Sequence, residues 1–176
     1  MRVLGIDPGT IRMGVAVLDV QGNQYELVAC ESVNLSAHLS LPARLQEIYE
    51  SVRVFIERFQ PEVVSLENVF YGKDVRALVK IGEARACAML AAAEKKIPVT
   101  EYPPARVKQA VSGNGRASKI QMQQMVRHLV RLKTTPPVDA ADALAVALCH
   151  VQSHRTQNLY QRIKNENRSH VRIPVG

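Results

Sequence analysis

The run R-V-L-G-I-D-P-G-T at residues 2–10 is an apolar β-strand that ends on an aspartate and a tight turn. Pro8 and Gly9 stop the strand, because proline fixes φ and glycine adopts turn conformations easily. Two further segments of strand composition follow after short turns, at Met13–Asp19 and Tyr25–Val33. Since short turns join antiparallel neighbours, we expect these three strands to form an antiparallel meander.

The periodicity changes to that of a helix at Leu41–Gln60, where apolar residues recur every three or four positions and Pro61 ends the run. The other expected elements are strands at 62–67 and 97–102, and helices at about 74–96, 105–111, 118–133 and 139–151. Three strands followed by alternating helices and strands predict a mixed α/β domain with a five-stranded sheet. The alanine-rich second half of the 74–96 helix allows another helix to approach closely, within the fold or across a dimer seam.

The 176 residues fit one domain of ordinary composition, with 22% charged residues and a net charge of +7. Residues 151–176 contain five Lys or Arg and one Glu, so they carry +4 of that charge. This polar segment is expected to be a flexible basic tail, 153–176, beyond a folded domain at 1–152. No acid occurs between 102 and 138, where seven bases lie. That stretch suits either a surface facing phosphate or a solvated helix face.

Three scattered cysteines, at positions 30, 87 and 149, lack metal-ligand spacing and fit core residues in a reduced compartment. The chain shows neither a secretion signal at its beginning nor an apolar run long enough for a membrane span. We therefore expect a cytoplasmic protein.

Four carboxylates stand at the ends of expected elements. Asp7 and Glu67 each follow an apolar strand, whereas Asp139 and Asp142 open the last helix three residues apart, on one face. Any one of them could be a turn residue, a strand-end residue or a helix cap. An acid in an apolar run is costly to ionise unless a cation compensates its charge. Together the four fit a site for two Mg²⁺ ions, which prefer carboxylate oxygens and can activate water against a phosphodiester.

Four motifs make the chain resemble the bacterial RuvC-type Holliday-junction resolvases over about residues 1–150. They are G-I-D-P-G-T at 5–10, E-N-V-F at 67–70, G-x-G-x-A-x-K-x-Q at 113–121 and D-A-A-D-A-L-A-V-A at 139–147. The resemblance implies a ribonuclease-H-like fold and a homodimeric endonuclease that resolves four-way DNA junctions in recombination and repair by two symmetric nicks. It also implies branch-migration motor partners of the RuvA and RuvB type, and Mg²⁺ as the cofactor, with Mn²⁺ as a possible substitute.

Matched by motif position, the family's catalytic and metal-binding carboxylates fall on Asp7, Glu67, Asp139 and Asp142. The resemblance also assigns DNA contacts. Phe70 takes the place of the family's aromatic residue near the junction centre, Lys108 and Lys119 those of phosphate-contacting lysines, and Arg116 is a further candidate. The alternative for Phe70 is a core residue and that for Lys119 an ordinary solvated lysine. Residues 71–76 depart from the family's pattern, beside the site and at the expected dimer seam.

Other classes of protein share parts of this pattern. The segment 5–17 is also similar to small ribonuclease-H-like proteins of ribosomal RNA maturation, but these lack the 139–147 block and the glycine loop before it. Sugar-kinase-like ATPases use a related first loop, yet they need two lobes and a second phosphate loop. A junction-binding protein without catalysis would require a missing carboxylate, and all four acids are present.

Overall fold

The computed structural model describes residues 1–68 and 75–170. Its five strands are β1 (Arg2–Asp7), β2 (Arg12–Gln21), β3 (Gln24–Asn34), β4 (Val63–Glu67) and β5 (Val99–Tyr102). Its five helices are α1 (Leu41–Phe59), α2 (Val75–Glu94), α3 (Pro104–Ser112), α4 (Lys119–Leu129) and α5 (Val138–His170). Every helix in these ranges is too short or too polar to cross a bilayer. The expected order of elements is confirmed.

The strands form one mixed sheet in the order β3-β2-β1-β4-β5. The predicted meander is present, because β1 pairs antiparallel with β2, and β2 with β3. β4 then lies parallel to β1, and β5 parallel to β4. Ile6 is opposite Leu66 in this register, so β1 and β4 end side by side on Asp7 and Glu67. Two acids sixty residues apart in sequence therefore meet at one edge of the sheet.

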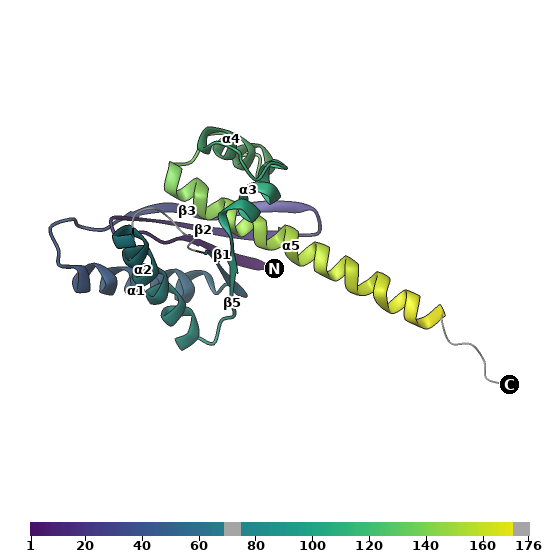
Figure 1. Cartoon of the computed structure of the whole chain (residues 1–176), viewed down its shortest axis with the longest axis horizontal. Coiled ribbons are helices and arrows are strands. Elements are labelled where there is room, and N and C mark those ends of the chain that lie inside the picture. The colour runs from purple at the N-terminus through teal and green to yellow at the C-terminus, as the bar shows by residue number, and fades with distance from the viewer. Residues whose placement is uncertain (69–74, 171–176) are drawn as a thin grey trace.

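Helices cover both faces of the sheet (Figure 1). One apolar layer joins α1 and α2 to the sheet, with Ile48, Val52 and the small residues Ala84 and Ala88 buried in it. The other layer lies under α3, α4 and α5, and the first part of α5 is buried almost continuously from Ala140 to Val151. The alanines of α2 thus serve helix packing within the fold, against α1.

Two glycines set how closely α5 approaches the sheet. A Cβ on Gly5 of β1 would lie 2.2 Å from the carbonyl oxygen of Ala143. A Cβ on Gly14 of β2 would lie 1.9 Å from the carbonyl oxygen of Asp139. Both distances are impossible for real atoms, so any side chain at either position would push the helix backbone away. The two glycines fix the first turns of α5 against the centre of the sheet.

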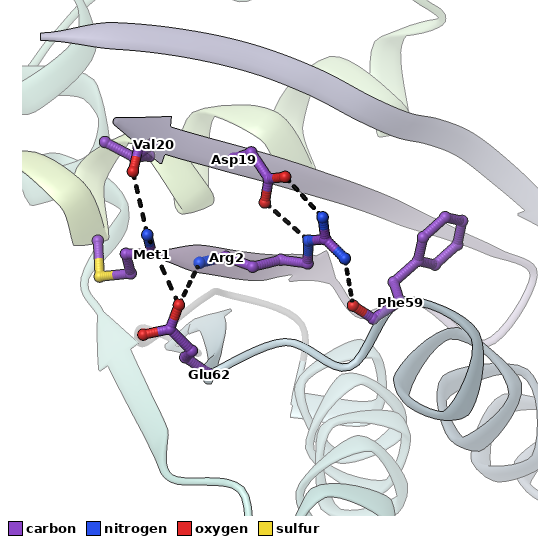
Figure 2. Close-up of polar contacts among 6 residues, drawn as sticks. All are labelled: Met1, Arg2, Asp19, Val20, Phe59 and Glu62. Atoms are coloured by element: carbon purple, nitrogen blue, oxygen red, sulfur yellow. Dashed lines mark hydrogen bonds and ion pairs between the residues drawn. The ribbon is translucent and has the colours of Figure 1, made fainter. Parts of the chain in front are cut away.

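The first residues of β1 close the opposite end of the sheet (Figure 2). The Arg2 guanidinium donates to both carboxylate oxygens of Asp19, at 2.7 and 2.6 Å, and to the carbonyl oxygen of Phe59 at 2.8 Å. The Arg2 amide donates to Glu62 Oε1 at 3.0 Å. This bidentate pair lowers the pKa of Asp19 and raises that of Arg2. Through these contacts Arg2 connects β2, the end of α1 and the residue just before β4.

α5 differs from its prediction, because it continues to His170 instead of ending near Val151. The predicted helix end near Val151 is therefore wrong. Neither glycine nor proline occurs between 138 and 170, so nothing in the sequence stops the helix. Arg155 attaches this part to the β2–β3 hairpin through Tyr25 Oη at 2.8 Å and the Gly22 carbonyl. Beyond Arg155, α5 extends away from the rest of the domain (Figure 1). The division into a folded domain at 1–152 and a flexible tail at 153–176 stays a prediction.

Gly5→Ala should destabilise the protein by about 3 kcal/mol or more, because the added methyl meets helix backbone that cannot rotate away. Chemical denaturation followed by circular dichroism measures the change. Gly82→Ala is the matched control, since a Cβ there meets nothing within 4 Å and lies inside α2. It should stabilise the chain by roughly 0.5–1 kcal/mol. Similar effects of both substitutions would show that α5 is not held at this distance by Gly5.

Candidate active site

The sheet and α5 bring all four predicted carboxylates to one region. Asp7 and Glu67 end the adjacent strands β1 and β4. Asp139 and Asp142 lie in the first turns of α5, where the Asp139 carbonyl sits over Gly14 and the Ala143 carbonyl over Gly5. Because Gly14 is paired with Asp7 in the β1–β2 ladder, the start of the helix lies beside the ends of both strands.

Burial and the charge of neighbouring acids raise the pKa values of Asp7, Glu67 and Asp142. Burial, followed by the negative charges of Glu67 and Asp142, raises the pKa of Asp7 from 3.8 to about 7. Burial, followed by the charge of Asp142, also raises the pKa of Glu67. The pKa of Asp142 is raised by burial as well, with Lys119 acting in the opposite direction and Asp139 adding repulsion. Each of these acids feels the charge of others in the group, so the four form one electrostatic cluster.

Two lysines face this carboxylate cluster. Lys119 Nζ lies 3.4 Å from Asp142 Oδ2, yet its side chain is 73% exposed and free to turn toward a ligand. Lys119 is the first residue of α4, whose start is set by a capping box between Ser118 and Gln121. Lys108, half-buried on α3, partly offsets through its charge the rise in the pKa of both Glu67 and Asp142. Both residues singled out as phosphate contacts thus lie near the acids.

The other two predicted DNA contacts stand differently. Arg116 is exposed in the loop between α3 and α4, where its backbone amide donates to Asn114 Oδ1 at 3.0 Å. None of the described contacts joins its side chain to the four acids. Phe70 lies outside the described residues, as do four positions of the divergent 71–76 segment.

Two contributors to the site went unnoticed in the sequence. Ser32 Oγ, on the edge strand β3, donates to Asp139 Oδ2 at 3.1 Å. Arg44 Nη1, on α1, donates to the carbonyl oxygen of Thr10 at 3.2 Å and so supports the loop after Asp7. Neither residue lies in a motif, and serine and arginine are common at such positions. Only the strand register and helix packing bring them to the site.

The donor set fits a hard divalent cation. Within residues 1–68 and 75–165, no three His, Cys, Asp or Glu side chains already stand close enough to hold an ion. Carboxylates without a counter-ion repel one another. Burial of Asp7 and this repulsion together raise the pKa of its carboxyl. A bound cation would remove the repulsion and draw the oxygens inward. The pKa values of Asp7 and Glu67 are raised mainly by burial and then by a neighbouring acid. Four carboxylates in such a setting are chemically suited to Mg²⁺ or Mn²⁺.

Comparison with known families gives one family model, "Crossover junction endodeoxyribonuclease RuvC", which matches residues 3–150. A protein of that name from Chloroflexus aggregans is 47% identical over 157 residues, covering 89% of this chain and 96% of its own length. Its counterpart from Dehalococcoides mccartyi is 44% identical over 160 residues, covering 90% and 96%.

Solved structures agree. Thermus thermophilus RuvC superimposes with a TM-score of 0.82 at 37% identity, covering 89% of this chain and 97% of its own. The same protein in complex with a Holliday-junction substrate superimposes with a TM-score of 0.84 at 36% identity, covering 89% and 96%. The yeast mitochondrial Holliday-junction resolvase, at 15% identity and a TM-score of 0.69, shares the fold. The expected ribonuclease-H-like α/β fold is confirmed.

Asp7→Asn should stabilise the metal-free protein at about pH 8. The pKa of the Asp7 carboxyl is about 7 in the folded protein, against 3.8 when it is unfolded. The free energy of unfolding of the wild type therefore falls as the pH rises between these two values. The neutral amide avoids this loss, which amounts to at most about 4 kcal/mol. Denaturant unfolding in EDTA measures the difference, which should shrink as the pH is lowered toward 5.

Asp19→Asn is the control of opposite sign, because the pKa of Asp19 is lowered by Arg2 and its charge therefore stabilises the fold at neutral pH. This variant should be less stable than the wild type at pH 8. An Asp7→Asn protein that is no more stable than the wild type there would contradict the assigned environment of Asp7.

Proposed function

The chain belongs to the RuvC family of crossover junction endodeoxyribonucleases, and we propose that Asp7, Glu67, Asp139 and Asp142 are its catalytic, metal-binding residues. The protein is accordingly a structure-selective endonuclease that resolves four-way DNA junctions in recombination and repair. The convergence of the four acids at one sheet edge, with two lysines beside them, supports the residue assignment. The family match favours this function over ribosomal RNA maturation and over junction binding without catalysis.

Nucleases of this family depend on a metal ion, and we propose that this chain uses two Mg²⁺ ions per site. The four carboxylates would hold them, and such ions supply an activated water and stabilise the leaving oxygen. The carboxylate cluster contributes up to four negative charges, which offset the charge of two divalent ions. Lys119 and Lys108 would orient the phosphate, since each carries its charge to the edge of the cluster.

The DNA contacts are proposed on the same grounds. Lys119 lies at the start of α4 after a glycine-containing loop, where backbone amides and an ammonium group can hold a phosphate together. Lys108 and Arg116 lie on the elements just before it, within the acid-free stretch of the sequence. Phe70 remains the candidate for stacking on a base near the crossover, by its position in the motif at 67–70.

We further propose that the active unit is an isologous homodimer, because two symmetric nicks require two sites facing a two-fold junction. The exposed apolar side chains of α2 support this proposal: Val75 is 67% exposed, Val79 54% and Leu90 63%. These residues lie on the helix that follows the Glu67 strand. Sedimentation should give a dimer at micromolar concentration, and a monomer with and without junction DNA would contradict it.

The resemblance to the family also motivates two proposals about the protein's setting. These are action in the cytoplasm and cooperation with branch-migration motor proteins of the RuvA and RuvB type on the same junction. Co-sedimentation of the chain with junction-bound motor proteins tests the second proposal, and equal recovery with and without those proteins would count against it.

Asp7→Asn should lose at least about 1,000-fold in cleavage of a synthetic four-way junction in Mg²⁺ while still binding it, because the change removes a proposed metal ligand but no DNA-binding cation. Gel assays of cleavage and of binding in EDTA measure the two effects. The wild type should cut the four-way junction in preference to three-way and linear duplexes of the same sequence. Wild-type cleavage by the variant would overturn the metal-site assignment.

Lys119→Ala is the contrasting variant in the same assays, because it leaves all four acids in place. It should weaken junction binding and lower the dependence of log Kd on log salt by roughly one counter-ion. An unchanged salt slope would show that Lys119 does not contact a phosphate.

A further inference from the structure

The edge strand β3 reaches the first turn of α5 through two side chains of one face. Ser32 Oγ donates to Asp139 Oδ2 at 3.1 Å, and Cys30 Sγ donates to the Ala140 carbonyl at 3.4 Å. Burial raises the pKa of the Cys30 thiol to about 11, so it stays protonated as a donor. Both contacts span more than a hundred residues of sequence.

The register of the sheet explains why Ser32 is the residue that reaches Asp139. Ser32 is opposite Gly14 in the β2–β3 ladder, and Gly14 is the position over which the Asp139 backbone lies. With no side chain on Gly14, the Asp139 carboxylate can meet the neighbouring strand directly. Residue 139 is thus held twice, by its main chain against β2 and by its side chain against β3.

A hydroxyl affects a carboxylate differently from an ammonium. Lys119, beside Asp142, carries a positive charge that competes with a cation for the same oxygen. Ser32 is neutral, so it fixes the orientation of Asp139 without cancelling the negative charge. Its hydrogen bond engages one oxygen, Oδ2, and none of the hydrogen bonds described for residues 1–68 and 75–165 involves Oδ1. Such outer contacts on a ligating carboxylate commonly change metal affinity or activity by 10- to 100-fold.

We propose that Ser32 is a positioning residue of the metal site, which orients Asp139 so that its second oxygen faces the cations. The proposal rests on the metal-site assignment of Asp139 made above. Ser32 itself touches neither DNA nor metal in this assignment. Its effect should therefore appear in metal affinity and leave junction binding without metal unchanged.

Mn²⁺ titration of the full-length chain without DNA tests this, followed by electron paramagnetic resonance of the free ion and by thermal shift. Ser32→Ala should raise the dissociation constant for Mn²⁺ about 10-fold. Ser32→Thr keeps the hydroxyl and should bind within about threefold of the wild type. Ser36→Ala, an exposed serine after β3, is the matched control and should bind like the wild type.

The Mg²⁺ concentration for half-maximal junction cleavage should shift in parallel, while the Kd for the junction in EDTA stays unchanged. Equal Mn²⁺ affinity of Ser32→Ala and the wild type would overturn the role of Ser32, as would a failure of Ser32→Thr to restore it. Asp139→Asn separates the two levels of the proposal. If it binds Mn²⁺ as well as the wild type does, the metal site itself is wrongly assigned.

Discussion

The close contact of α5 with β1 and β2 is the constraint on which the rest of the site depends. Gly5 and Gly14 let carbonyl oxygens of the helix occupy the space of a side chain. This places Asp139 and Asp142 beside the ends of β1 and β4, although they lie more than seventy residues after Glu67. A side chain at either glycine would hold the helix farther from the sheet and move its two acids away from Asp7.

That arrangement places function in opposition to stability. The charges of Asp7, Glu67 and Asp142 are all disfavoured by burial, and they repel one another. The apolar layers on both faces of the sheet, and the Arg2–Asp19 pair at the far end of β1, belong to the stabilising side of the balance. A fold that holds acids close together favours cation binding, because a bound cation would remove the repulsion between the carboxylates.

The supporting contacts come from elements that carry none of the four acids. β3 contributes Ser32, α1 contributes Arg44 to the loop after Asp7, and the capping box at the start of α4 places Lys119. The surroundings of the carboxylate cluster are therefore built by several parts of the domain, and not by the strands and the helix that carry the acids alone.

The sequence by itself determined the order of the elements and the four acids, because strand ends, helix period and motif spacing are local features. Asp7 before Pro8-Gly9, and Asp139 with Asp142 one helical turn apart, can be recognised without coordinates. Only the tertiary structure decided that Gly5 and Gly14 lie under α5 and that Ser32 reaches Asp139, because these contacts depend on strand register and helix position. It also decided the length of α5. The sequence predicts a helix end near Val151, yet α5 continues to His170, where neither glycine nor proline interrupts it and Arg155 attaches it to the hairpin.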